Sequence, residues 1–102
     1  MLDEVAHPMK EYTRAFILVQ CEPMREQDVI EELLKMEEVV EAHMITGEYD
    51  VLAVVQVKRI FLEADYDNLF QSAIAKVEGA KYVLDTNTIV GMASKSKFPE
   101  SV

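Results

Sequence analysis

The chain has 102 residues, half of them hydrophobic, with 10 Lys and Arg against 19 Asp and Glu and a formal net charge of −9. This length allows a single domain, and no apolar run approaches the roughly 20 residues of a membrane-spanning helix. The acidic balance argues against direct binding to nucleic acid, because phosphate contacts need a basic face.

The N-terminal sequence indicates the compartment. Asp3 and Glu4 stand where a secretory signal would carry basic residues before an apolar run. The single cysteine, Cys21, cannot form an internal disulfide, which is typical of a reducing environment. We therefore expect a cytoplasmic protein that neither crosses nor binds a membrane.

Residues 1–11 follow no hydrophobic period and predict a flexible N-terminal arm. Residues 12–21 predict the first strand, in which alternate side chains point to opposite faces. Both faces of this strand are apolar: Ala15, Ile17 and Val19 lie on one, and Phe16 and Leu18 on the other.

A helix is predicted over residues 24–36, after Pro23, which suits a helix entry. One buried stripe follows the helical spacing: Val29, Ile30, Leu33 and Leu34. The many acidic side chains off this stripe are interpreted as a solvated surface and not as a binding site.

Two further strands are predicted over residues 37–45 and 49–58. In the first, Val40, Ala42 and Met44 share one side, and Val39, Glu41, His43 and Ile45 share the other. In the second, Val51, Ala53, Val55 and Val57 lie opposite Leu52 and Val54. His43 has no nucleophile or carboxylate spaced to make it a catalytic base, so we expect a structural or surface histidine.

The turn between these strands reads Thr-Gly-Glu-Tyr-Asp, over residues 46–50. Gly47 has no Cβ and can adopt the positive φ that a hairpin turn often needs. Such a turn also leaves backbone N–H groups that a small anionic group could approach. The alternative is that the segment is a hairpin turn and nothing more.

A second helix is predicted over residues 64–77, ended by Gly79, and a last strand over residues 81–90. In that strand Tyr82, Leu84, Thr86, Thr88 and Val90 share one face, and Val83, Asp85, Asn87 and Ile89 share the other. Residues 93–102 form a polar C-terminal tail, expected to be flexible or docked on a neighbour. The globular domain therefore spans residues 12–92.

This order of elements predicts an α+β fold of the ferredoxin-like βαββαβ type, with a four-stranded antiparallel sheet and two helices on one face. The helices cover only one face of the sheet, yet the strands are apolar on both. We therefore expect the uncovered face to pack against a second copy in a two-fold dimer.

Several of these segments together resemble one known family. They are residues 15–19, the helix at 29–34, Val40 with Glu41, the turn at 46–50, Val77-Glu78-Gly79 and the strand at 86–90. In this order they resemble the ligand-binding domain of the Lrp/AsnC regulators, also called the RAM domain. The resemblance covers residues 12–90, and the Gly-x-Tyr-Asp turn is its most specific part.

The resemblance implies a function that spacing alone does not. Such domains dimerise through their sheets, often form rings of dimers, and bind amino acids or similar effectors near the interfaces between dimers. Carried over, Gly47, Glu48, Tyr49 and Asp50 would form the loop wall of the pocket, and Thr86 and Thr88 would supply hydroxyl groups. The structural alternative is that Asp50 braces the turn and the threonines only favour a strand.

The sequence departs from the full-length family in two ways. The segment before the first strand is too short for a helix-turn-helix domain, which indicates a stand-alone form without the DNA-binding role. The link over residues 58–63 is longer than usual, so no site residue is assigned to the second helix.

The resulting hypothesis is a non-enzymatic module that senses an amino acid without a metal or other cofactor. Binding would change its assembly, or its association with full-length regulators of the same family. Two alternatives remain: a small dimeric α/β-barrel enzyme of the oxygenase type, which shares the fold, and a structural adaptor without a ligand. No cofactor motif or cluster of His, Asp and Glu supports the enzyme.

Overall fold

The computed structural model describes residues 7–8, 12–58, 66–91 and 95–96 of the chain. In chain order its elements are β1 (His7–Pro8), β2 (Tyr12–Cys21), α1 (Glu26–Leu34), β3 (Val39–Met44), β4 (Val51–Lys58), α2 (Tyr66–Glu78), β5 (Val83–Gly91) and β6 (Lys95–Ser96). The elements from β2 to β5 follow the predicted order of strand, helix, strand, strand, helix, strand.

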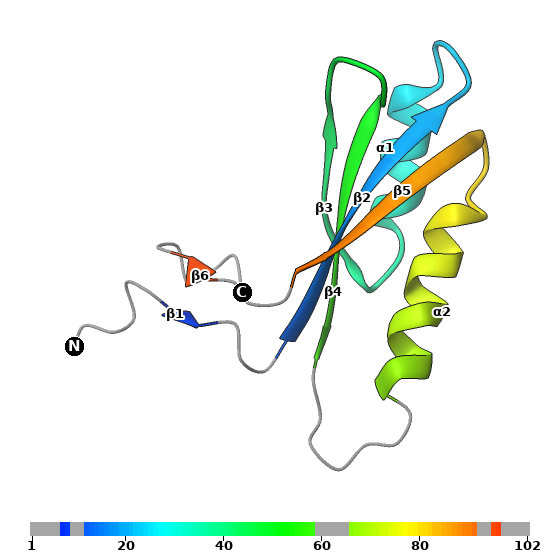
Figure 1. Ribbon diagram of the computed structural model, residues 1–102. Coiled ribbons are helices and arrows are strands. Elements are labelled where there is room, and N and C mark those ends of the chain that lie inside the picture. The colour runs from blue at the N-terminus through cyan, green and yellow to red at the C-terminus, as the bar shows by residue number, and fades with distance from the viewer. Residues whose placement is uncertain (1–6, 9–11, 59–65, 92–94, 97–102) are drawn as a thin grey trace.

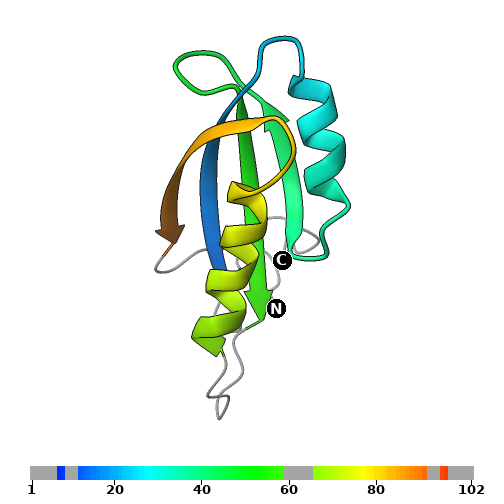
Figure 2. The same ribbon diagram turned by 90° about the vertical axis from the view of Figure 1, so that its right-hand side faces the viewer.

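The four long strands form an antiparallel sheet in the order β3-β4-β2-β5. Both helices pack on the same side of it, as Figures 1 and 2 show. The ferredoxin-like prediction is therefore confirmed. We call the sheet surface under the helices the helix face, and the opposite surface the open face.

A second, very short ladder pairs β1 with β6 antiparallel, with His7 opposite Ser96. It lies on the side of the sheet away from the helices (Figure 1). No periodicity in the sequence indicated these two strands, because two residues are too few to show an alternating pattern.

The hydrophobic core lies between the helix face and the two helices. It is built from alternate residues of the two central strands and one stripe of each helix: Ala15, Ile17, Val19 and Cys21; Val51, Ala53, Val55 and Val57; Val29 and Leu33; Phe70, Ala73, Ile74 and Val77. The predicted alternation of β2 and β4 is confirmed, since these residues are all buried.

Both helices differ slightly from the prediction. The predicted burial of Leu34 is wrong, because α1 ends at that residue and its side chain is 50% exposed. Lys35 and Met36 continue only as a tightened turn, donating to the carbonyls three residues earlier. Gly79 follows α2, as predicted, whereas the predicted start at residue 64 and most of the long link at 58–63 lie outside the described residues.

The predicted faces of β3 are partly wrong because the strand carries a bulge. Val40 is an extra residue in the pairing with β4, so the alternation shifts by one position there. Val39 therefore shares the helix face with Ala42 and Met44, and the side chain of Val40 is left 42% exposed. The strand is also shorter at each end than the predicted 37–45.

A second bulge changes the start of β5. The register against β2 shifts at Leu84, which places Val83 opposite Cys21 on the helix face. Thr86, Thr88 and Val90 share that face, as predicted, but Leu84 does not join them and Tyr82 precedes the strand. In β4 the prediction was also two residues too long, since the strand begins at Val51 and not at residue 49.

Candidate functional site

The six predicted site residues fall into two separate groups. Gly47, Glu48, Tyr49 and Asp50 belong to the loop of residues 45–50 between β3 and β4, and Thr86 and Thr88 belong to β5. Strand β2 lies between β4 and β5 in the sheet. With a strand spacing of about 4.8 Å, the two groups are roughly two strands apart and do not meet within one chain.

Gly47 occupies a backbone conformation that favours glycine. Its φ is +117°, and a Cβ built on it would meet no atom within 4 Å. A larger residue would therefore be opposed by backbone strain and not by lack of space. The prediction that Gly47 provides a positive φ for the turn is confirmed.

The 45–50 loop leaves several of its N–H groups without a protein acceptor. Its ends are bonded: the N–H of Ile45 donates to the carbonyl of Asp50 at 2.9 Å, and the N–H of Asp50 donates to the carbonyl of Val19 at 2.8 Å. Within the part of the chain that the structure describes, the N–H groups of residues 46–49 make no such bond. Thr46, Gly47 and Glu48 are exposed, so a small anion could reach these donors.

The Asp50 side chain ties this loop to the sheet. Its Oδ2 accepts a hydrogen bond of 2.9 Å from the backbone N–H of Cys21, at the end of β2. Burial raises the pKa of the Cys21 thiol, and the negative charge of Asp50 raises it further. Asp50 therefore braces the turn, as the structural alternative expects, through contacts with both the backbone N–H and the thiol of Cys21.

The two threonines lie on the helix face of β5. Thr86 is opposite Val19 and Thr88 is opposite Ile17, both core residues of β2. The Thr88 hydroxyl oxygen is buried and has no hydrogen-bond partner in the described structure. A buried hydroxyl without a partner is costly, and because this oxygen is buried within the single chain, a ligand would reach it only after a local rearrangement.

The structure also reveals a cluster that the sequence analysis missed, around Tyr82. The Arg25 guanidinium lies 4.5 Å and the Lys81 ammonium 5.0 Å from the Tyr82 ring centroid. The N–H of Glu22 donates to the Tyr82 carbonyl at 3.0 Å. Because Cys21 is bonded to Asp50, this cluster and the 45–50 loop lie at the same end of the sheet (Figure 1). No spacing in the sequence links Arg25 to Tyr82, so only the fold could show this contact.

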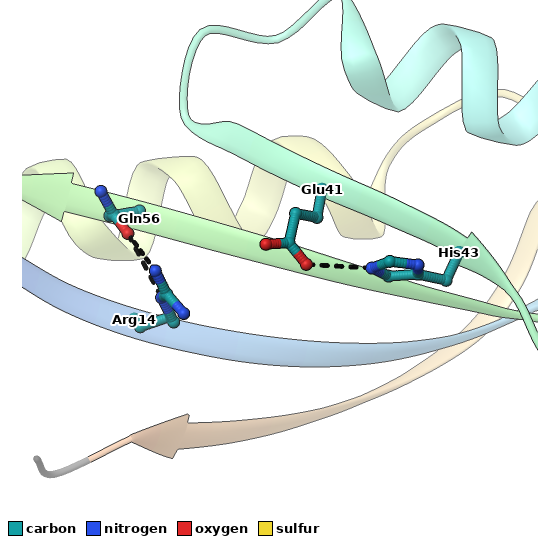
Figure 3. Close-up of polar contacts among 4 residues, drawn as sticks. All are labelled: Arg14, Glu41, His43 and Gln56. Carbon is teal, nitrogen blue, oxygen red and sulfur yellow. Dashed lines mark hydrogen bonds and ion pairs between the residues drawn. The ribbon is translucent and has the colours of Figure 1, made fainter. Parts of the chain in front are cut away.

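The open face has an apolar centre with polar groups around it. The centre consists of Phe16, Leu18, Leu52 and Ile89 from three adjacent strands, around Val54, which is already buried in the single chain. Arg14 donates to Gln56 Oε1 at 2.7 and 3.2 Å, and His43 Nε2 lies 2.9 Å from Glu41 Oε1 (Figure 3). His43 is a surface residue, as the sequence analysis expected.

Neither a metal site nor a membrane-spanning helix is found among the described residues. No group of three or more His, Cys, Asp or Glu among the described residues could hold a metal ion. No described helix is long and apolar enough to span a membrane.

A family model matches most of the globular part of the chain. The model of the Lrp/AsnC ligand binding domain matches residues 14–97, which include all but the first two residues of β2, the other three long strands, both helices and all six candidate residues. The chain belongs to this family. The resemblance drawn from the 46–50 turn and the flanking strands is thus confirmed, and it places this Lrp/AsnC domain in a family of regulatory ligand-binding modules.

Solved structures agree with this assignment. A hypothetical protein of Pyrococcus horikoshii, PHS023, is 32% identical with a TM-score of 0.61, over 78% of this chain and 89% of that one. The protein FFRP-DM1 is also 32% identical, with a TM-score of 0.62, over 78% of this chain and 99% of that one. No curated protein matches the chain.

A more distant structure has the same fold and a bound amino acid. It is the feast or famine regulatory protein Rv3291c of M. tuberculosis, complexed with L-methionine. Its identity is 18% and its TM-score 0.59, over 78% of this chain and 50% of that one. At this identity the likeness concerns the fold alone.

Proposed function

We propose that this chain is a non-enzymatic regulatory module that binds an amino acid or a similar small metabolite. Binding would act through the assembly of the module, or through its association with full-length Lrp/AsnC regulators. The proposal is carried by one observation: a loop with unbonded N–H groups at residues 46–49, in a domain of a ligand-binding family. The methionine complex of the M. tuberculosis protein supports the class of ligand.

The chemistry of the loop suits an amino acid. The N–H groups of residues 46–49, in a turn shaped by the positive φ of Gly47, would receive an α-carboxylate, and the negative charge of Asp50 would attract the ammonium group. Thr86 and Thr88 are two strands away on the helix face. A site that uses both groups would therefore take the loop from one copy and the threonines from another.

The open face supports assembly of the module as a dimer. An apolar centre with a polar rim is the usual composition of a protein interface, and a two-fold axis lets one surface bind itself. The rim carries both signs of charge, since Arg14 and Glu41 both lie on the open face. The face-to-face dimer would bury the apolar centre that the helices leave uncovered.

A thermal-shift screen against the twenty amino acids tests the ligand proposal. We expect one amino acid, or a few related ones, to raise the melting temperature by several degrees, because a ligand present at 100 times its Kd stabilises the folded state by about 2.7 kcal/mol. Analytical ultracentrifugation with and without the active amino acid would then show whether the mass of the assembly responds.

Variants of the 45–50 loop distinguish a role in ligand binding from a role in stabilising the turn. Asp50→Asn keeps an oxygen for the Cys21 N–H but removes the charge. We therefore expect it to abolish the ligand-induced rise in melting temperature and to preserve most of the stability of the free protein. Asp50→Ala should lose both the ligand-induced rise and part of that stability. Glu31→Gln on the exposed side of α1 removes one charge elsewhere and is the matched control. Gly47→Ala should weaken binding through backbone strain, whereas Gly79→Ala, whose Cβ would lie 3.4 Å from a backbone oxygen, should not.

The outcomes separate the candidate functions. No shift with any amino acid would contradict the sensor proposal and favour a structural adaptor. A shift that survives Asp50→Asn and Gly47→Ala would contradict the assignment of the site to the 45–50 loop while leaving a sensor.

A further inference from the structure

The open face carries an ion pair beside its apolar centre. Glu41 and His43 are two positions apart in β3, after the bulge at Val40, so both side chains lie on this face. Their pairing partners in β4 are Val54 and Leu52, at the middle of the same face. His43 Nε2 lies 2.9 Å from Glu41 Oε1, and the two side chains are 52% and 41% exposed. The pair therefore lies at the rim of the surface that the proposed dimer would dehydrate.

The net charge of this pair depends on the protonation of His43. Histidine is the side chain whose ordinary pKa, about 6.5, lies within the physiological range. A neutral imidazole can donate an N–H to the Glu41 carboxylate, and the pair then remains negative. A protonated imidazole forms a charge-assisted hydrogen bond with the same oxygen, and the pair becomes neutral.

Few other groups in the chain titrate in the same range. Carboxylates, with ordinary pKa values of about 4, are already ionised at pH 5.5, and lysines remain protonated at pH 7.5. The chain has two histidines, His7 and His43. His7 lies in β1, in the separate two-stranded ladder, whereas His43 lies in the four-stranded sheet. Between pH 5.5 and pH 7.5 the charge of the open face therefore changes mainly at His43.

The two elements packed against β3 bring no further charge to His43 in the described structure. β3 is an edge strand that pairs with β4, where Leu52 and Val54 are the nearest residues on the open face. α1 packs against β3 from the helix face, where Val39 joins the core. The acids of α1 therefore lie on the other side of the sheet from His43 (Figure 2).

The remaining charges near the pair do not replace His43. The other charged side chains that the structure describes on the open face or in the loop after β3 are Arg14, Glu48, Asp50 and Asp85. Arg14 is hydrogen-bonded to Gln56, on the far side of β4 from the pair (Figure 3). Asp50 is bonded to the N–H of Cys21. His43 is therefore the group whose protonation neutralises Glu41.

We propose that Glu41 and His43 form a pH-sensitive switch at the interface of the face-to-face dimer, and that protonation of His43 tightens this dimer. A carboxylate that loses its water without a cation nearby is costly, whereas a paired one is much less so. Two copies that each carry a net charge of −9 also repel each other less when each gains a proton. The switch deepens the proposed function and rests on it, because it acts on the dimer that the open face would form.

Sedimentation equilibrium at pH 5.5 and pH 7.5, at constant ionic strength, tests the switch. Since each copy supplies one His43, we expect the dissociation constant of the wild-type dimer to be about tenfold lower at pH 5.5. His7→Gln removes the other histidine and is the matched control, which should keep this change. His43→Gln should reduce the change to less than about threefold.

Glu41→Gln distinguishes the ion pair from a general effect of net charge. Without the carboxylate, protonation places an unpaired cation at the interface in each copy, so this dimer should be weaker at pH 5.5 than at pH 7.5. If net charge alone were responsible, the same variant would be tighter at pH 5.5. Both side chains are substantially exposed, and urea unfolding at each pH would verify that the variants fold as the wild type does.

Three results would overturn the proposal. They are a wild-type dissociation constant that is equal at the two pH values, a His43→Gln variant that keeps the full wild-type change, and a Glu41→Gln dimer that is tighter at pH 5.5. Each of these would leave the dimer and the amino-acid screen unaffected. A chain that stays monomeric at both pH values and at high concentration would overturn the switch together with the dimer, so the two failures are distinguishable.

Discussion

At the scale of single residues, Asp50 both holds the 45–50 loop in place and belongs to the candidate site. Its backbone closes the 45–50 loop through Ile45 and Val19, and its side chain fixes the loop to the N–H of Cys21. A loop held at both ends presents its remaining N–H groups in a fixed arrangement. Preorganisation of this kind lowers the entropy cost of binding a small ligand.

The Cys21 thiol predicts a pH dependence of stability. Burial is the larger cause and the charge of Asp50 the next, and both raise the pKa of the thiol in the folded state. The folded chain therefore keeps this proton at pH values at which the unfolded chain has lost it. Stability is therefore unaffected below the unfolded pKa of about 8.5 and falls as pH rises toward the folded pKa. Urea unfolding at pH 7 and pH 10 should show a larger loss for wild type than for Cys21→Ala. Equal losses would assign the alkaline effect to lysines and tyrosines alone.

The sequence indicated the positive φ of Gly47 but not that of Tyr82. Glycine between two apolar runs predicts a positive φ by its lack of a Cβ, and the structure has one. Tyr82 also has a positive φ, 71°, but a tyrosine carries no signal for this conformation. Its contacts with Arg25 and Lys81 depend on where the fold brings the ends of α1 and β5.

At the scale of elements, the strands were predictable where the pairing is regular. In β2 and β4 every second residue faces the core, so the apolar pattern gives the faces directly. In β3 and β5 one extra residue, Val40 or Leu84, reverses the alternation. A bulge is decided by how two strands fit together, and a single strand's sequence does not contain that information.

Among the described residues, Met24 and Tyr82 have a positive φ without being glycine, and we expect a glycine substitution to have opposite effects at the two positions. Met24 has a φ of 69° and a side chain that is 89% exposed, so Met24→Gly removes a left-handed strain of about 1 to 2 kcal/mol and loses little packing. The entropy of glycine in the unfolded chain offsets roughly 0.5 to 1 kcal/mol of this gain. We expect Met24→Gly to raise the stability by about 0.5 kcal/mol in urea unfolding.

Tyr82→Gly should do the reverse. The ring packs against the core and receives the Arg25 cation, so its loss should cost about 2 kcal/mol in spite of the relieved strain. Tyr82→Phe keeps the ring and should remain close to wild type. A stabilising Tyr82→Gly would show that strain outweighs packing at this position.

At the scale of the whole molecule, the sheet has two apolar surfaces and the helices cover one. This was predictable, because Phe16 and Leu18 alternate with the core residues of β2. The separation of the candidate loop from Thr86 and Thr88 follows from the ferredoxin-like strand order, in which β2 lies between β4 and β5, and no local pattern shows it. Strand order comes from the crossovers and not from any local pattern.

A charge on the open face tests the proposed dimer. Leu52 lies in its apolar centre, and Leu52→Arg would place two unpaired cations in the interface, one from each copy. Since an unpaired buried charge costs about 2 to 5 kcal/mol, the dimer should dissociate at least 100-fold more readily. Leu34→Arg on α1, at a leucine that is 50% exposed, changes the net charge equally and should stay dimeric. Sedimentation equilibrium measures both constants. If Leu52→Arg remained a dimer as tight as Leu34→Arg, the open face would not be the interface, and a pocket shared between dimers would lose its structural basis.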